Sequence, residues 1–243
     1  MTRPLIVAHR GNSSVAPENT MLAFGSAVRA GADMIEIDVH VDGDGTFVVI
    51  HDDTVDRTTD GTGAVQALST EDIRRLDAGA GFAVDTAGQR VPLLTDVVDL
   101  MVVHPHLRLL LELKGDWEPD QVKQLLGVLE PVLPRVLPQS FYVATVRALG
   151  EVAPDAPRGL LVLGIDEAVM ALCADLGVTA CNPYVGFVRE NIGVIADLHA
   201  AGLQTFVWTA NEPEQWRLLV DAGVDGVITD RPDRLGGWLD AVQ

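Results

Sequence analysis

The chain has 243 residues, of which 48% are hydrophobic, and this length and composition suit a domain with a packed core. Its formal net charge of -18 disfavours nucleic acids and anionic membranes as partners, because Lys and Arg side chains supply most of the affinity for their phosphates. No stretch has the roughly eighteen uncharged apolar residues of a membrane helix, so we expect no stable membrane association. The sequence carries no indication of an oligomeric state.

The N-terminal segment and the two cysteines both favour the cytoplasm. Residues 1–11 contain only a very short apolar run, which predicts a strand instead of a signal peptide. Cys173 and Cys181 follow no metal-binding or redox spacing, and we expect both to be buried free thiols in a reducing compartment. The expectation is therefore a cytoplasmic protein with a single domain over residues 1–243.

Short apolar runs alternate with helical patterns along the chain, as is typical of a mostly parallel sheet with crossover helices. The first helical pattern follows the capping residue Asn19 and stops at Gly31. Similar helical patterns occupy residues 120–130, 144–152, 166–176, 190–201 and 213–222. The strand candidates, in chain order, are Leu5–Ala8, Met34–Val39, Phe47–Ile50, Arg108–Leu113, Val136–Phe141, Gly159–Leu163, Val178–Cys181, Gln204–Trp208 and Gly226–Thr229.

These elements predict an α/β fold, a (β/α)8 TIM barrel, with a doubly wound open sheet as the alternative. Nine strand candidates are one too many for eight barrel strands. Phe47–Ile50 follows Met34–Val39 through a turn too short for a crossover helix, so it should pair antiparallel with its predecessor or form an irregular barrel strand. Residues 52–95 contain a polar, glycine-rich stretch and one short helix near 70–77, which we interpret as an insertion over one barrel face.

Reactive side chains concentrate in four short segments, each at the C-terminal end of a predicted strand. That edge carries the chemistry of essentially all characterised barrel enzymes, so we expect these side chains to meet in one site. The segments are Ala8-His9-Arg10-Gly11, Ile35-Glu36-Ile37-Asp38-Val39, Val49-Ile50-His51-Asp52 and Leu111-Glu112-Leu113-Lys114.

Strand periodicity predicts that the acidic residues point into the barrel. Glu36 and Asp38 are two residues apart and share one face, and Glu112 shares a face with Lys114 in the same way. Three carboxylates converging in an interior would repel one another unless a cation binds them. Oxygen ligands suit Mg²⁺ or Ca²⁺, so these three acids are the candidate metal ligands. The alternative interpretation is a structural salt-bridge network with Arg10 and Lys114.

His9 and His51 are the candidate catalytic residues, because histidine titrates near neutrality without assistance. Hydrolysis of a phosphodiester needs one group to deprotonate the nucleophile and another to protonate the leaving alkoxide, and two histidines beside a metal supply both. Arg10 and Lys114 are suited to neutralising phosphate oxygens, and Trp208 to forming the apolar wall of a substrate pocket. The simpler alternatives are buried structural histidines, charge balance among the acids, and core packing for the tryptophan.

Two further polar residues lie near these segments. His40 is two residues beyond Asp38, and it would either face the site or lie in the following turn. Asp230 closes the last predicted strand, where we expect it to cap the next segment or form a salt bridge.

Taken in order, the motifs resemble the glycerophosphodiester phosphodiesterase family over nearly the whole chain. Each motif alone has low specificity, whereas the ordered set is highly specific. The matching segments are His9-Arg10-Gly11, Pro17-Glu18-Asn19-Thr20, Gly31-Ala32-Asp33, Glu36-Ile37-Asp38-Val39, His51-Asp52, Arg57-Thr58-Thr59, Glu112-Leu113-Lys114, Val207-Trp208-Thr209-Ala210-Asn211 and residues 223–232.

The resemblance implies a barrel with a small insertion after His51 and hydrolysis of a small glycerophosphodiester to sn-glycerol 3-phosphate and an alcohol, dependent on Mg²⁺ or Ca²⁺. It implies that Glu18 supports the loop after the first strand. By residue-level match it also implies acid/base catalysis by His9 and His51, metal binding by Glu36, Asp38 and Glu112, and phosphate contacts from Arg10 and Lys114.

Some positions depart from the family pattern, such as Tyr142, which stands where Asp or Asn is frequent. None of the departures removes a proposed catalytic group, but they leave the choice of substrate headgroup open, because loops around the pocket set it. The alternatives are a phospholipase-type phosphodiesterase of the same fold and a non-catalytic small-molecule-binding barrel.

Overall fold

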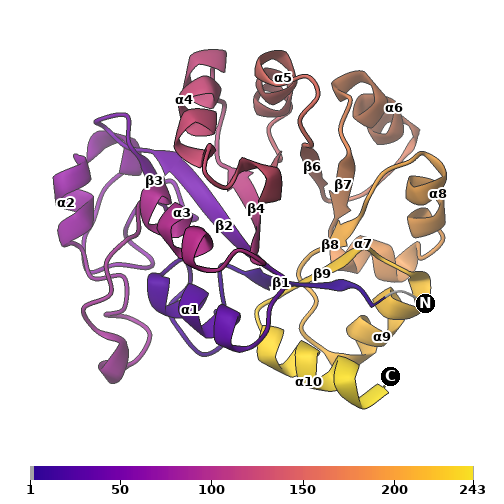
Figure 1. The fold of residues 1–243 in the computed structure, drawn as a ribbon, viewed down its shortest axis with the longest axis horizontal. Helices are drawn as coiled ribbons and strands as arrows, with labels where there is room; N and C mark the ends of the chain where they lie inside the picture. The colour runs from indigo at the N-terminus through magenta and orange to yellow at the C-terminus, as the bar shows by residue number, and fades with distance from the viewer. Residues whose placement is uncertain (1–2, 243) are drawn as a thin grey trace.

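Eight parallel strands form a barrel at the centre of the computed structural model, which describes residues 3–242. Each of these strands pairs with the next one along the chain, and β9 returns to pair with β1. Between β7 and β8 the pairing is reduced to isolated bridges, so the barrel is nearly closed. The strands are β1 Leu5–His9, β2 Met34–Val41, β4 Arg108–Leu113, β5 Val136–Ser140, β6 Gly159–Val162, β7 Ala180–Pro183, β8 Phe206–Val207 and β9 Gly226–Thr229 (Figure 1).

This arrangement confirms the expected (β/α)8 TIM barrel and excludes the open sheet, because parallel bridges join β7 and β8, the two ends of the strand order, which an open sheet would leave apart. The remaining strand, β3 (Phe47–Val49), pairs antiparallel with β2, as the short connecting turn predicted. The strand β3 therefore stands apart from the order of the barrel strands and accounts for the ninth strand candidate.

Helices surround the strands on the outside of the barrel (Figure 1). The first of them begins one residue later than the sequence indicated, because the side chain of Thr20, and not that of Asn19, accepts a hydrogen bond from the Ala23 N–H. The helices are α1 Met21–Arg29, α2 Thr70–Arg75, α3 Leu94–Val103, α4 Pro119–Leu129, α5 Val143–Val152, α6 Glu167–Leu176, α7 Val185–Glu190, α8 Val194–Ala200, α9 Pro213–Ala222 and α10 Pro232–Val242.

The helices α3 and α10 were not predicted. The α3 segment is rich in Val and Leu, and its three polar residues, Thr95, Asp96 and Asp99, give it only a narrow polar face, which is a weak signal for a surface helix in a sequence. Its buried residues nevertheless recur at helical spacing, as Leu94, Val97, Val98 and Met101, and packing on the barrel decides its conformation. The predicted helix over 190–201 corresponds to α8, which begins only at Val194, and α7, which ends at Glu190, was not predicted either.

Two strands at the weakly paired seam also differ from expectation. The strand β7 begins at Ala180 instead of Val178, and β8 covers only Phe206–Val207 of the predicted Gln204–Trp208. The ladder of β7 with β6 begins only at Ala180, and β8 pairs with β9 only at Phe206 and Val207. Neither strand is extended by its other neighbour, because β7 and β8 share only isolated bridges.

The insertion between β3 and α3 lies at the side of the barrel where β2 and β3 form their hairpin (Figure 1). It contains α2, which ends two residues before the predicted end, and it has a small apolar core of its own. That core consists of Val48, Ile50, Val55, Val65, Ile73, Ala78 and Val91.

The strand periodicity predicted from the sequence is present in the structure. Met34 of β2 and Leu110 of β4 pack with residues of other strands in a small interior cluster. Their neighbours Ile35 and Leu111 belong to the large cluster that strands and surrounding helices share. The alternate residues at the C-terminal ends of β2 and β4, which are acidic, therefore point to the inside.

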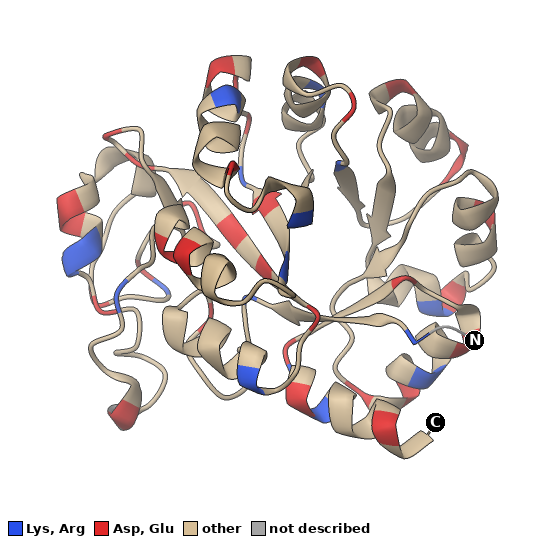
Figure 2. Cartoon of the chain, viewed as in Figure 1, with Lys and Arg blue, Asp and Glu red and all other residues tan. Residues whose placement is uncertain are grey.

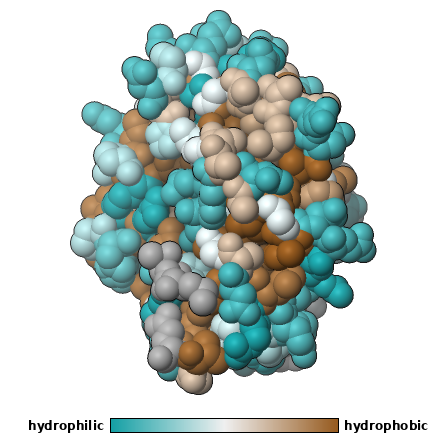
Figure 3. Space-filling model, turned by 90° about the vertical axis from the view of Figure 1, so that its right-hand side faces the viewer, coloured by the Kyte–Doolittle hydropathy of each residue, from teal (hydrophilic) through white to brown (hydrophobic). Residues whose placement is uncertain are grey.

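Acidic residues are also distributed over the outer helices and loops (Figure 2). On the face shown in Figure 3, hydrophilic side chains alternate with apolar patches over the barrel helices. Within residues 3–242, no helix combines the length and the apolar character that crossing a membrane would need.

Candidate active site

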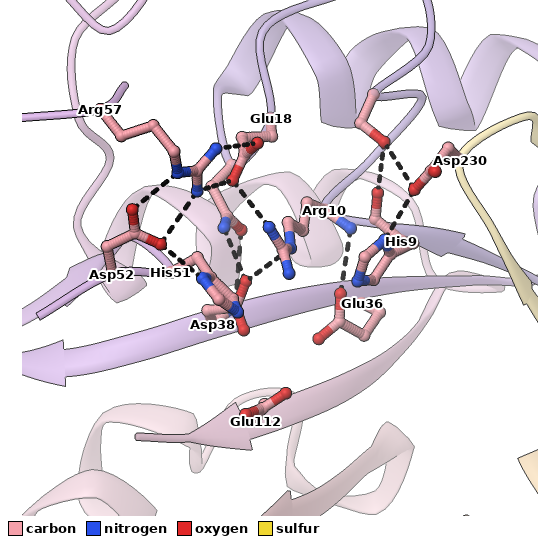
Figure 4. Close-up of polar contacts among 12 residues, drawn as sticks. His9, Arg10, Glu18, Glu36, Asp38, His51, Asp52, Arg57, Glu112 and Asp230 are labelled. Atoms are coloured by element: carbon pink, nitrogen blue, oxygen red, sulfur yellow. Dashed lines mark hydrogen bonds and ion pairs between the residues drawn. The ribbon is translucent and has the colours of Figure 1, made fainter. Parts of the chain in front are cut away.

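Three acidic side chains meet at the C-terminal end of the barrel. Glu36 and Asp38 come from β2, and Glu112 comes from the adjacent β4, where it lies in register with Asp38. All three are buried, and each offers an oxygen within 4.8 Å of those of the other two (Figure 4). The parity of the strands thus brings together the three acids that the sequence indicated as candidate metal ligands.

Two basic side chains contact this cluster. The Lys114 Nζ lies 2.6 Å from the Glu112 Oε1 and 3.1 Å from the Asp38 Oδ1. The Arg10 Nε lies 3.2 Å from the Asp38 Oδ2, and the Arg10 backbone N–H donates to the Glu36 Oε2 at 3.0 Å. The salt bridges of the alternative interpretation are therefore present, but two cationic side chains face three carboxylates, so the salt bridges leave one negative charge unbalanced.

The pKa values reflect this imbalance. Burial, together with the charges of Asp38 and Glu112, raises the pKa of Glu36. Burial and the charge of Asp38 raise the pKa of Glu112 to about 7. Burial alone would raise the pKa of Asp38 as well, but Lys114 and Arg10 hold it below its usual range.

The cluster fits a divalent cation, because its donors are all carboxylate oxygens. Its two glutamates also lie close to the negative charge of a neighbouring carboxylate, which a cation would neutralise. A hard cation would replace the protons that this charge draws onto Glu36 and Glu112. Mg²⁺ and Ca²⁺ both prefer such oxygen ligands.

His9, the last residue of β1, lines the pocket beside the acidic cluster. Its Nδ1 lies 2.6 Å from the Oδ1 of Asp230, which follows β9, the neighbour of β1 in the barrel. Burial opposes ionisation of Asp230, but the hydrogen bond with His9 and the charge of that ring lower its pKa to about 2. Asp230 therefore contacts the imidazole of His9, at the strand end where the sequence predicted a cap or a salt bridge.

His51 lines the opposite part of the same pocket, after β3. Its Nδ1 lies 2.6 Å from the Oδ1 of Asp52, and burial lowers the pKa of the imidazole. His40 does not lie in a turn, because it belongs to β2, and its Nε2 lies 3.0 Å from the carbonyl oxygen of His51. His40 is buried behind the site and contacts the backbone of His51 instead of lining the pocket.

Arg10 occupies an unusual backbone conformation. Its φ is 55°, in the left-handed region that side chains other than Gly, Asn and Asp seldom adopt. Gly11 follows with φ 83°, and a Cβ there would lie 2.7 Å from the backbone carbon of Ala23 in α1. The strained loop aims both the backbone N–H and the guanidinium of Arg10 at the acidic cluster.

The pocket between the two histidines is polar on one side and apolar on the other. Trp208 forms part of the apolar side, and the Phe141 ring packs edge-on against it at 5.3 Å between centroids. Tyr184 packs against the same indole, also at 5.3 Å. The lining residues are His9, Arg10, Glu36, His51, Glu112, Lys114, Gln139, Phe141, Leu161, Trp208 and Ile228.

Several residues of the site were not singled out for a role in it. Asp52 was quoted only as part of a motif, although its position directly after His51 was a usable signal. Arg57, which contacts Asp52 and Glu18, carries no signal in its local sequence beyond the motif. Asn19 was assigned as a helix cap, but its Nδ2 donates to the Asp38 Oδ2 at 2.8 Å, so it contacts the acidic cluster.

Comparisons with known proteins agree with this geometry. The sequence profile of the glycerophosphoryl diester phosphodiesterase family matches residues 9–234. A glycerophosphodiester phosphodiesterase of Caldanaerobacter subterraneus subsp. tengcongensis is 36% identical over 239 residues, which cover 96% of both chains.

Solved structures of the same fold cover the chain almost completely. A phosphodiesterase of Oleispira antarctica in complex with the product sn-glycerol-3-phosphate has a TM-score of 0.89 and 28% identity, covering 98% of this chain and 97% of that one. A glycerophosphodiester phosphodiesterase of Agrobacterium tumefaciens has a TM-score of 0.84 and 32% identity, covering 97% and 100%. The chain therefore belongs to the glycerophosphoryl diester phosphodiesterase family.

Proposed function

We propose that this phosphodiesterase hydrolyses a small glycerophosphodiester to sn-glycerol 3-phosphate and an alcohol, with His9 and His51 as the acid and base and with a divalent cation. One observation carries the proposal: two carboxylate-paired histidines line the same pocket as Glu36 and Glu112 of the three-carboxylate cluster. The product-bound relative, which has the same fold over nearly the whole chain, supports the choice of substrate class.

The cation would be held by Glu36, Asp38 and Glu112, whose mutual repulsion it would relieve. Mg²⁺ or Ca²⁺ suits these ligands, and the bound ion would supply Lewis-acid stabilisation of negative charge on a phosphoryl oxygen. Lys114 and Arg10 would add positive potential beside it, which offsets the repulsion between an anionic substrate and a chain of net charge -18.

The paired carboxylates prepare both histidines for proton transfer. A carboxylate that accepts from Nδ1 favours the tautomer with the proton on that nitrogen, which leaves Nε2 available to accept a proton. Asp230 serves His9 in this way, and Asp52 serves His51. One ring would accept the proton of the nucleophile and the other, protonated, would donate to the leaving oxygen.

The apolar side of the pocket would exclude water from the carbon atoms of the substrate. Phe141, Leu161 and Trp208 present that surface opposite the charged residues. We also propose that the insertion and the barrel act as one domain, because Arg57 of the insertion contacts Glu18 of the β1–α1 loop. The cytoplasmic location inferred from the sequence stays a prediction.

The test is the release of sn-glycerol 3-phosphate from a panel of glycerophosphodiesters, and of the headgroup alcohol from one lysophospholipid, with and without EDTA. We expect release that EDTA abolishes and that Mg²⁺ or Ca²⁺ restores. Absence of release from every substrate, or release that EDTA leaves unchanged, would refute the proposal, whereas release from the lysophospholipid alone would favour the phospholipase-type alternative.

The two histidines are tested separately with His9→Ala and His51→Ala. Each variant should lower turnover by about 10² or more, the usual magnitude of general acid–base catalysis. The exposed His199, which lies 3.0 Å from Asp225 on the outside of the barrel, provides the matched control as His199→Ala. Turnover close to that of the control in either variant would remove that histidine from the mechanism.

A further inference from the structure

We propose that Arg57, carried by the insertion, is a positioning residue that holds both His51 and Arg10 in place through two carboxylates. The inference rests on the function proposed above and adds a role for the insertion. Arg57 itself does not line the pocket between the histidines. It acts through Asp52 on one side and through Glu18 on the other (Figure 4).

The first contact fixes the acceptor of His51. The Arg57 Nε donates to the Asp52 Oδ2 at 2.6 Å, and its Nη2 donates to the Asp52 Oδ1 at 3.0 Å. That Oδ1 also lies 2.6 Å from the His51 Nδ1. A carboxylate held at both oxygens cannot rotate away from the imidazole, so the orientation of the His51 ring depends on Arg57.

The second contact fixes the partner of Arg10. The Arg57 Nη1 donates to the Glu18 Oε2 at 2.9 Å, and its Nη2 donates to the Glu18 Oε1 at 2.8 Å. The same Oε1 accepts from the Arg10 Nη1 at 2.8 Å. Because the Arg10 Nε lies 3.2 Å from Asp38, the chain of contacts reaches the acidic cluster.

Only a guanidinium can make these contacts together. Its planar fork presents five N–H donors, and four of the contacts above are met by its Nε, Nη1 and Nη2 atoms. A Lys ammonium keeps the charge, but its single nitrogen cannot donate bidentately to two carboxylates. The hydrogen bonds from Arg57 also lower the pKa of Asp52, which keeps it an anionic acceptor for His51.

The insertion is built to hold this side chain. Arg57 lies in a loop whose two ends join through the bridge between Thr54 and Ala64 and through the hydrogen bond from the Val55 N–H to the Gly63 carbonyl. Val55 is completely buried in the apolar core of the insertion. The loop is thus anchored next to Arg57, while the Arg57 side chain remains 48% exposed.

Because the Arg57 side chain is partly exposed, its effect on the alignment of catalytic groups can be measured separately from its effect on the stability of the fold. Ion pairs between partly exposed side chains contribute little to the free energy of unfolding, so Arg57→Ala should leave the melting temperature close to that of the wild type. Loss of alignment at a catalytic group, in contrast, lowers turnover strongly, by up to about 100-fold for a displacement near 1 Å.

The experiment compares kcat, KM and melting temperature for Arg57→Ala, Arg57→Lys and a control, Arg75→Ala. Arg75 lies in α2 of the same insertion, and its ion pairs among the described residues are with Glu71 and Asp72 of its own helix, so its loss should change none of these quantities. We expect Arg57→Ala to lower kcat by about 10- to 100-fold. Arg57→Lys should restore little of it, because the fork is lost.

Two readouts separate positioning from a general structural effect. In a double-mutant cycle, Arg57→Ala and Asp52→Ala together should cost much less than the product of their separate effects on kcat. The ¹⁵N shifts of the imidazole rings report their tautomers, and Arg57→Ala should move those of His51 while those of His9, held by Asp230, stay unchanged.

These experiments can refute the role of Arg57 without refuting the proposed function. Normal kcat in Arg57→Ala, full activity in Arg57→Lys, multiplicative effects in the cycle, or unchanged His51 shifts would each overturn it. Absence of activity in both the wild type and Arg75→Ala would instead refute the proposed function on which it rests.

Discussion

Replacing the carboxylate of Asp230 tests whether this side chain orients the His9 imidazole. Its Oδ1 accepts from the Ser13 Oγ at 3.2 Å and lies 2.6 Å from the His9 Nδ1. Its Oδ2 accepts from the Asn211 Nδ2 at 2.6 Å. Each neighbour is a donor, so Asp230→Asn replaces one of two acceptor oxygens with an NH₂ group that must face a donor.

The cost can be estimated from these contacts. If the amide oxygen faces His9, its nitrogen opposes the Asn211 amide, and if it faces Asn211, the imidazole loses its acceptor. Hydrogen bonds to charged groups contribute about 1.5–3 kcal/mol. Since about 1.36 kcal/mol corresponds to a tenfold change in rate, Asp230→Asn should lower kcat/KM by roughly 10- to 150-fold.

The assay measures kcat/KM for the best glycerophosphodiester of the panel at saturating metal. Asp221→Asn, an exposed acid-to-amide change on α9, is the matched control. Circular dichroism and thermal melting verify that both variants are folded. If folded Asp230→Asn hydrolysed the substrate as fast as the control, the idea that this carboxylate orients His9 would be wrong.

Three further predictions concern metal binding, folding and acid stability. Glu112→Gln should raise the metal concentration for half-maximal activity by roughly 10- to 100-fold or more, since loss of a partner that does not even contact the metal typically costs that much. An unchanged metal titration after EDTA treatment would contradict a ligand role. Gly11→Ala should destabilise the fold by about 1–3 kcal/mol in urea unfolding, because its Cβ would meet Ala23 at 2.7 Å with φ 83°; an unchanged midpoint would refute this. The pKa of Asp230 is about 2 in the folded chain, below its usual value of 3.8, so the unfolded state binds more protons between these values. This carboxylate therefore stabilises the fold above pH of about 4 and ceases to do so as the pH falls to about 2. The stability difference between the wild type and Asp230→Asn should narrow over that window, and a constant difference would contradict the shift.

Much of the site follows from local geometry, and so the sequence alone determined it. Alternation along a strand has a period of two, which places Glu36 and Asp38 on one face whatever the rest of the chain does. The C-terminal ends of parallel strands meet at one edge of a barrel. His9 and Glu112, which stand at the ends of neighbouring strands, therefore lie near those acids.

The partners of these residues depended on the tertiary structure. His9 and Asp230 are 221 residues apart, and they meet only because the barrel closes β9 against β1. Arg57 reaches Glu18 across 39 residues because the insertion folds back over the β1–α1 loop. Strand parity is a property of neighbouring backbone angles, whereas barrel closure and the path of a loop result from the packing of the whole chain. The sequence therefore determined which groups line the site, and the tertiary structure decided which side chains orient them.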